Sequence, residues 1–198
     1  MAADPSSTLT ARRVAQTRRE VAETALTLSR ERGWDAVSVA DLVAASGVST
    51  RTFYRYFARK EDVFVPLLEE ATGRLQRIFV TAAEPDLALR SAQALEQSLH
   101  DFPGGLGEAH RSYGILLSHD DLEPVWLAAA VRAEPGFAAA LRQAFPTLDD
   151  GHDGRLAAAV IISCQRIALT DWVAGPADAS LTRLAERAIR AGLGPLES

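Results

Sequence analysis

The stretch SVADLVAASGVSTRTFYRYFARKED, residues 38–62, decides the fold of this chain. Ser38 followed three residues later by Asp41 is typical of a helix start, because both side chains can serve free backbone N–H groups there. Gly47 is placed to end this first helix, since glycine adopts a left-handed conformation without penalty. Ser49 is placed to cap a second helix. Two short helices joined by so tight a turn predict a helix-turn-helix.

The second of these helices has two unlike faces. At 100° per residue, Phe53 and Phe57 lie close together and are expected to point into the core. The opposite face carries Arg51, Tyr54 and Arg55, with no acidic residue in that helix. Such side chains suit phosphates and base edges in a DNA groove. The alternative is an ordinary amphipathic helix whose arginines are only solvated.

These residues resemble the TetR family of transcriptional regulators. The resemblance covers about residues 17–71, near a third of the chain. It rests on the turn Gly47-Val48-Ser49, on the run from Thr52 to Phe57, and on the Lys60-Glu61-Asp62 that follows. The resemblance implies DNA binding through Ser38, Val39, Ser49, Thr50, Arg51, Thr52, Tyr54, Arg55, Tyr56 and Lys60, with the lysine on a phosphate.

The chain departs from the family pattern at two places. The two positions after Ser49 are often lysine and glycine in the family, and here they are Thr50 and Arg51. Arg51 is therefore expected to change which bases are read. Ala58 and Arg59 replace the commoner proline and serine, which adds a candidate phosphate contact.

Charge is distributed unevenly along the chain. The net charge of −5 is unusual for a DNA-binding protein, but residues 1–65 carry ten basic against eight acidic residues, a net +2, while residues 66–198 carry −7. Local patches of positive charge, rather than the charge of the whole chain, create the field that phosphates meet. The arginine cluster near the motif is thus compatible with DNA binding.

Nothing along the chain predicts a β-strand, so we expect an all-α fold of about nine helices. A first helix is expected from Thr10 to Arg32, and another from Lys60 to about Ala83 with a kink at Pro66. Further helices are expected at about 85–101, 106–118, 121–133, 135–145, 153–174 and 180–192, separated by Gly and Pro breaks. We assign a flexible arm (1–14), a DNA-binding domain (15–75, with the motif at 38–57) and an effector-binding and dimerisation domain (76–198).

The last two predicted helices carry more apolar surface than one small domain needs to cover. In TetR-like proteins such a pair forms a four-helix dimer interface, and the resemblance implies a homodimer here. Candidate interface residues are Val160, Leu184 and Ile189. The alternative is a core formed within one chain.

The resemblance also implies a small-molecule effector pocket among the middle helices. Its candidate lining is aromatic and mildly polar, as is usual for small-molecule sites; the residues are Phe102, His110, Tyr113, Trp126, Phe137, Gln165 and Trp172. For each of them, packing in the core is the alternative.

Other function classes find little support in the sequence. The four histidines lack the spacing of metal ligands, the single Cys164 excludes an intrachain disulfide, and there is no nucleophile elbow or Gly-rich phosphate loop. We expect no cofactor, no metal, no membrane span and a cytoplasmic location. An all-helical enzyme using Asp171 or the histidines and a helical interaction module stay as weaker alternatives.

The sequence therefore predicts a dimeric regulator that binds a palindromic double-stranded DNA operator. A repressor released by a small molecule is the first expectation. An activator, or a regulator that needs no ligand, is the nearest alternative on the same scaffold.

Overall fold

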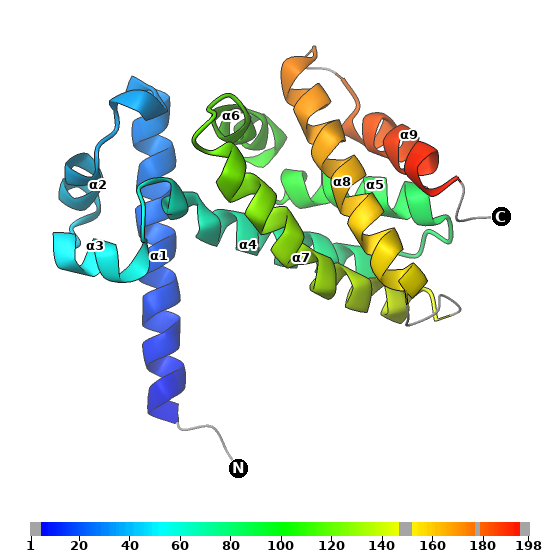
Figure 1. Cartoon of the computed structure of the whole chain (residues 1–198), viewed down its shortest axis with the longest axis horizontal. Coiled ribbons are helices and arrows are strands. Elements are labelled where there is room, and N and C mark those ends of the chain that lie inside the picture. Colours follow the sequence, from blue (N-terminus) through cyan, green and yellow to red (C-terminus); the bar gives the residue numbers. More distant parts are fainter. Residues whose placement is uncertain (1–4, 147–151, 177–178, 195–198) are drawn as a thin grey trace.

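The computed structural model describes residues 5–146, 152–176 and 179–194, and within these ranges all regular elements are helical. The predicted all-α class is confirmed. The elements, labelled in Figure 1, are α1 (Pro5–Arg32), η1 (Trp34–Ala36), α2 (Val39–Ser46), α3 (Thr50–Tyr56), η2 (Glu61–Phe64), α4 (Val65–Thr81), α5 (Leu87–His100), α6 (Gly105–Leu117), α7 (Glu123–Ala144), α8 (His152–Ala174) and α9 (Leu181–Leu193).

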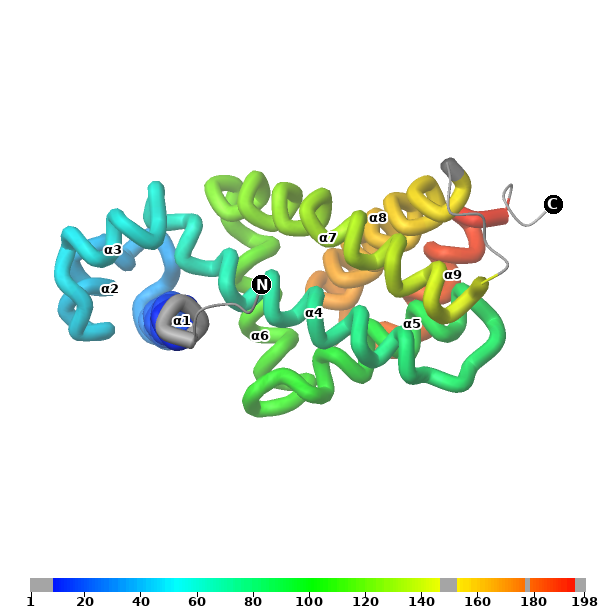
Figure 2. The backbone as a smooth tube through the Cα atoms, turned by 90° about the horizontal axis from the view of Figure 1, so that it is seen from below, coloured from blue at the N-terminus to red at the C-terminus, as the bar shows by residue number. Residues whose placement is uncertain are grey.

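The helices form a small lobe beside a larger bundle (Figure 1). In the small lobe α1 packs against α2, and α3 contacts α2 across the turn. In the bundle, α8 packs against both α7 and α9, while α5 packs against α4 and α9. Figure 2 shows α4 leading from the small lobe into the bundle. This helix is therefore the main structural link between the two parts.

Aromatic side chains fill the core of the small lobe. Phe53 and Phe57 of α3 are 0% and 1% exposed, which confirms the predicted inward face. Trp34 is fully buried and its ring centroid lies 4.9 Å from that of Phe64. Truncating a buried aromatic of this kind costs about 3–5 kcal/mol. This packing fixes which face of α3 points outward.

The first helix is longer than predicted. It begins at Pro5 instead of near Thr10, so residues 5–14, which the sequence analysis assigned to an arm, are helical. Proline is well tolerated at the first helical position, because its missing N–H would lack a partner there anyway. Residues 1–4, the rest of the predicted arm, lie outside the described residues.

Pro66 does not kink a continuous helix. The chain instead forms the short 3₁₀ element η2 and then begins α4 at Val65, with Pro66 in the first turn. A first-turn proline removes a donor that has no partner within the helix. The expected kink is thus replaced by a change of helix at the entrance to the bundle.

Pro135 does not separate two helices. α7 runs without interruption from Glu123 to Ala144, so the two helices predicted at 121–133 and 135–145 are one. Pro135 lies on the exposed side of α7, where water can serve the carbonyl that loses its helical partner. On the inner side, Gln76 of α4 donates to the Ala133 carbonyl oxygen at 3.4 Å.

Two features of the bundle bear on the predicted organisation. The predicted domain boundary at 75/76 falls inside α4, which packs against α1 as well as α5 and α7. Within α8, the segment Asp153–Ala174 is long and apolar enough to cross a membrane by length and composition alone. α8 packs against both α7 and α9, and this packing accounts for its apolar composition.

Candidate functional site

The predicted caps hold the turn between α2 and α3. The Asp41 N–H donates to the Ser38 hydroxyl at 3.2 Å, and the Ser38 N–H donates to the Asp41 carboxylate at 2.9 Å. Hydrogen bonds from the Ser38 hydroxyl and backbone, with Arg32 beside them, lower the pKa of Asp41. Gly47 ends α2 at φ 70°, and Ser49 accepts a hydrogen bond from the Thr52 N–H at 3.1 Å. The sequence therefore predicted this motif down to its caps.

The outward face of α3 presents two arginines and Tyr54, and the partly buried Tyr56 lies beside Arg55. Arg51 and Arg55 are exposed, and Tyr54 is 56% exposed. Arg55 donates to the Tyr56 hydroxyl at 2.9 Å, and its guanidinium lies 4.8 Å from the centre of that ring. Arg51 forms no hydrogen bond or ion pair with the described residues. This face is rich in donors and carries no carboxylate of its own.

The remaining candidates at the motif divide into capping and surface positions. The hydroxyls of Ser38 and Ser49 serve the caps, and Thr52 accepts from the Ser49 hydroxyl at 2.9 Å. Thr50 is exposed and Val39 is partly buried. Among the serine and threonine candidates for DNA contact, Thr50 is thus the one whose hydroxyl takes no part in the caps.

The Lys60 ammonium contacts backbone carbonyls of the small lobe, and its contact with a phosphate stays a prediction. The ammonium donates to the carbonyl oxygens of Val37, at 3.0 Å, and Trp34, at 3.5 Å. It also lies 4.0 Å from the centre of the Trp34 ring, a cation–π distance. The ammonium therefore ties the end of η1 to the start of η2, inside the small lobe.

Replacing Lys60 by methionine is expected to destabilise the small lobe by about 1–3 kcal/mol, because charge-assisted hydrogen bonds and the cation–π contact are lost together. Denaturant unfolding followed by tryptophan fluorescence measures this loss. Arg59→Met is the control, since Arg59 is exposed and pairs only with the nearby Asp62. Unchanged stability of the Lys60 variant would show that these contacts are not needed.

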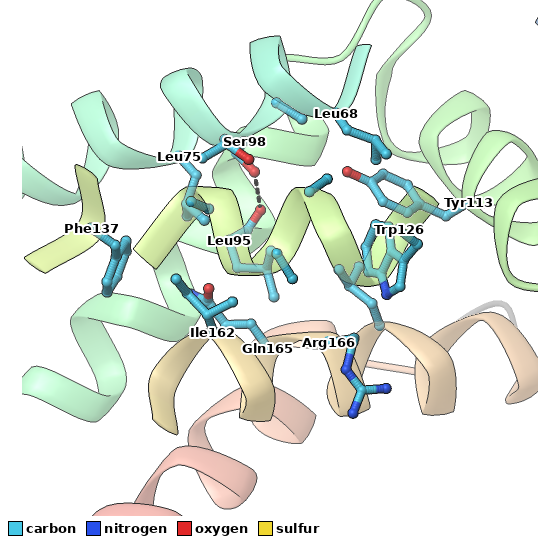
Figure 3. Close-up of a pocket in the computed structure, with 16 residues that line it drawn as sticks. Leu68, Leu75, Leu95, Ser98, Tyr113, Trp126, Phe137, Ile162, Gln165 and Arg166 are labelled. Atoms are coloured by element: carbon cyan, nitrogen blue, oxygen red, sulfur yellow. Dashed lines mark hydrogen bonds between the residues drawn. The ribbon is translucent and has the colours of Figure 1, made fainter. Parts of the chain in front are cut away.

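A pocket lies in the bundle, enclosed by α4, α5, α6, α7 and α8 (Figure 3). Four of the predicted residues line it, namely Tyr113, Trp126, Phe137 and Gln165. Tyr113 and Trp126 meet edge to face, with ring centroids 5.5 Å apart. Burial raises the pKa of Tyr113 to about 12, so its hydroxyl keeps its proton at neutral pH.

The other three predicted pocket residues lie elsewhere. Phe102 lines a separate groove among α1, α4 and the loop before α6. His110 and Trp172 pack edge to face on each other, with ring centroids 4.6 Å apart, and Trp172 is 2% exposed. Trp172 is therefore part of the core between α6 and α8.

Much of the pocket wall was missed by the sequence analysis. α4 contributes small and aliphatic residues that recur at helical spacing, and α5 and α8 add others. These residues are Leu68, Ala71, Thr72, Leu75, Leu95, Ser98, Ile162, Arg166 and Leu169. The spacing of 68, 71, 72 and 75 on one face of α4 was the signal available in the sequence.

The candidate dimer residues also divide. Val160 of α8 and Leu184 of α9 are partly buried in the single chain. Ile189 is 0% exposed, because this face of α9 packs against the chain's own α5 and α8. Ile189 is therefore a core residue of one chain and is removed from the candidate interface.

The side chains of His100, His110 and His119 are among those that the structure describes, as is that of Asp171. Among the described residues, no group of three histidine, cysteine or acidic side chains is placed to hold a metal ion. His119 instead lies 3.5 Å from the exposed carboxylate of Asp35.

Comparisons with known proteins agree with this geometry. Residues 21–67 match the model of a family described as bacterial regulatory proteins, tetR family. No curated protein matches the chain.

Several solved structures share the fold. A TetR transcriptional regulator from Rhodococcus sp. RHA1 has a TM-score of 0.65 at 18% identity, over 90% of this chain and 96% of that one. The TetR-family repressor FadR from Thermus thermophilus, solved with lauroyl-CoA, has a TM-score of 0.60 at 18% identity, over 89% and 93%. A tetR-family regulator from Streptomyces coelicolor has 0.57 at 17%, over 91% and 82%.

The family match spans α2, α3 and the buried aromatic face of α3, and the structural similarity extends over nearly the whole chain. The resemblance seen in the sequence is confirmed: the helix-turn-helix segment is that of the TetR family of bacterial regulatory proteins, and the chain has the fold of TetR-family regulators.

Proposed function

We propose that the protein is a transcriptional regulator that binds a DNA operator through the outward face of α3. The observation that carries this proposal is the pair of exposed arginines on that face, held in place by Phe53 and Phe57 beneath them. Arginine forks fit guanine edges and phosphates, and tyrosine hydroxyls donate to phosphate. As a regulator of chromosomal genes, it would work in the cytoplasm.

Binding of the protein to duplex DNA is expected to weaken steeply as salt rises. Each phosphate neutralised contributes about −0.9 to the slope of log affinity against log salt concentration on B-DNA. Fluorescence anisotropy of a labelled duplex, titrated at several salt concentrations, measures the slope. A flat dependence would contradict the proposed role of the arginines.

The proposed active form is a homodimer joined along α8 and α9. The side of α8 turned away from the core is uncharged at successive turns, where it carries Leu156, Ala159, Ser163, Ile167, Thr170 and Ala174. Leu184 and Ala188 of α9 are partly buried and continue this surface. A surface helix with so long an uncharged face favours contact with a second copy. We name the eight residues the α8–α9 seam.

The proposed regulation is release of the operator when a small molecule fills the pocket. FadR from Thermus thermophilus supports this proposal, since it is a TetR-family repressor solved in complex with lauroyl-CoA. The dimer would exist in two conformations that differ in the spacing of its two recognition helices. An effector that binds one conformation more tightly than the other shifts the population toward that conformation. A spacing that does not fit two half-sites releases the DNA.

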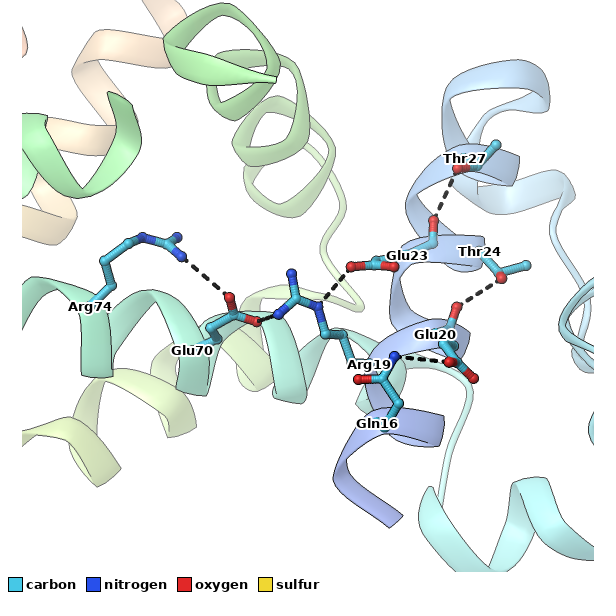
Figure 4. A network of polar contacts seen from close by, with 8 residues as sticks. All are labelled: Gln16, Arg19, Glu20, Glu23, Thr24, Thr27, Glu70 and Arg74. Atoms are coloured by element: carbon cyan, nitrogen blue, oxygen red, sulfur yellow. Dashed lines mark hydrogen bonds and ion pairs between the residues drawn. The ribbon is translucent and has the colours of Figure 1, made fainter. Parts of the chain in front are cut away.

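A polar relay joins the pocket wall to the small lobe (Figure 4). Arg74 of α4 donates to the carbonyl oxygen of Ser98, a pocket residue, at 2.9 Å, and lies 3.4 Å from Glu70. The other oxygen of Glu70 lies 2.9 Å from Arg19 of α1, which also pairs with Glu23 at 2.8 Å. We propose that displacement of α4 by an effector reaches α1 through these contacts.

The substitution Glu70→Gln is expected to reduce the effector response while leaving the fold intact. Partly exposed ion pairs stabilise a fold by about 1 kcal/mol or less, whereas allosteric coupling energies are typically about 1–3 kcal/mol. Operator affinity, measured with and without a releasing compound from a screen, gives the coupling. The control is Glu69→Gln, because Glu69 is exposed and forms no ion pair with the described residues. Equal coupling in both variants would exclude the relay.

A further inference from the structure

The pocket wall excludes one charge class of ligand. Of the sixteen residues that line it, one is charged, Arg166 of α8, and none is acidic. Most of the remainder are aliphatic, alanine or aromatic. A cationic ligand would lose its hydration in this wall and gain no carboxylate partner. The ligand body is therefore apolar, and any charge that it carries is negative.

One buried donor at the pocket lacks a partner. The indole N–H of Trp126 is buried and has no hydrogen-bond partner among the described residues, and an indole N–H can only donate. Buried polar groups in native proteins are normally paired, so this N–H calls for a partner that accepts. Tyr113 is 6% exposed, and its hydroxyl, which can donate or accept, also forms no hydrogen bond with the described residues.

Two other polar groups of the wall already have partners. The Gln165 side-chain amide donates to the carbonyl oxygen of Ser91 at 3.1 Å, and the Ser98 hydroxyl donates to that of Leu95 at 2.7 Å. Arg166 forms no ion pair or hydrogen bond with the described residues. The polar groups of the pocket that have no partner among the described residues are thus the indole N–H, the phenol, the guanidinium, the Thr72 hydroxyl and the side-chain oxygen of Gln165.

Tyr113, Trp126 and Arg166 lie toward one end of the pocket, and Phe137, Leu75 and Ile162 lie toward the other (Figure 3). The guanidinium of Arg166 is directed away from the two rings. Trp126 and Phe137 are both on α7, eleven residues apart. At 1.5 Å per residue this separation is about 16 Å along the helix. The pocket therefore has the polarity of an elongated molecule with one acceptor head.

We propose that the pocket binds an elongated apolar carboxylate, with its head at Trp126, Tyr113 and Arg166 and its body running toward Phe137. The inference rests on the proposed function only in treating this molecule as the effector. The carboxylate offers acceptor oxygens to the indole N–H and the tyrosine hydroxyl, and its charge is opposite to that of the one guanidinium of the wall. The apolar chain replaces water along the aliphatic wall.

The test is calorimetric titration of the full-length protein, without DNA, with decanoate and with decylamine below their micelle concentrations. The two probes share one chain length and carry opposite charges. Decanoate is expected to bind at least tenfold more tightly than decylamine. Equal or tighter binding of decylamine, or no binding of decanoate, would overturn the proposal.

Two variants locate the head group. Arg166→Gln and Trp126→Phe are each expected to weaken decanoate binding by at least fivefold, while Arg155→Gln, an exposed arginine on the same helix, leaves it unchanged. Circular dichroism verifies that each variant is folded. An unchanged affinity in both pocket variants contradicts the assignment of the head.

The outcome is separable from that of the proposed function, because no DNA is present. If the protein binds a DNA operator but not decanoate, the proposed function stands and the proposed ligand class is wrong. If the protein binds decanoate but no DNA, the proposed ligand class stands and the proposed function is wrong.

Discussion

Replacement of Ile167 by aspartate is expected to convert the protein into folded monomers that no longer retain operator DNA. Ile167 lies in the middle of the α8–α9 seam and its side chain is 46% exposed in the single chain, so the monomer tolerates a charge there. In a dimer the carboxylate would be buried without a partner, at a cost of several kcal/mol for each copy. Monomers also lose the gain in affinity that two linked DNA-reading helices provide.

Sedimentation velocity and operator binding of the Ile167 variant measure both effects. Val131→Asp is the matched control, because Val131 is 62% exposed on α7, outside the seam, and should remain a dimer. If the Ile167 variant sediments as a folded dimer and still binds operator, the seam lies elsewhere. Ile189→Asp is unsuitable for this purpose, since a charge at that fully buried position is expected to unfold the chain.

The second large effect is expected for Arg51→Ala, which should reduce operator affinity by about 1–3 kcal/mol and relax the preference for the correct sequence. Arg51 is exposed on α3 and has no partner among the described residues, so its removal leaves the fold unchanged. A specific duplex and a scrambled one, compared by anisotropy, give both quantities. Arg155→Ala on α8 is the remote control. An equal loss on the two duplexes would mean that Arg51 contacts phosphate and reads no base.

The helix-turn-helix was predictable because its determinants are local. Ser38, Asp41, Gly47 and Ser49 act within four residues of themselves, through caps and a left-handed turn. Serine and aspartate at these positions are typical of helix N-terminal caps, and glycine is typical of a left-handed helix end. The sequence therefore specifies this part of the fold without knowledge of what packs against it.

The prolines show where local reasoning fails. Pro66 and Pro135 carry the same signal, yet Pro66 begins a helix and Pro135 lies within one. The difference depends on the neighbours, such as Gln76, which contacts a carbonyl of α7 from α4. Such contacts between distant segments override local propensity, and a single sequence does not reveal them.

The places of single candidate residues depend on distant neighbours for a related reason. Trp172 and Tyr113 are both buried aromatics with an aromatic neighbour, but only Tyr113 borders the pocket. Lys60 carries the charge that a phosphate contact requires, but its ammonium donates to the carbonyl oxygens of Trp34 and Val37. Ile189 is apolar as an interface requires, and it packs on its own chain instead. Residue type indicates what a side chain can do, and packing selects among the options.

The central claim, that the outward face of α3 reads a DNA sequence, is tested most directly by selection of bound duplexes from a random pool. The account predicts enrichment of one palindrome, with half-sites about one helical turn or slightly more apart, as two recognition helices of a symmetric dimer require. It also predicts that Arg51→Ala weakens the base preference at particular positions within each half-site. A pool that remains unenriched after repeated selection with the folded, wild-type protein would contradict the account.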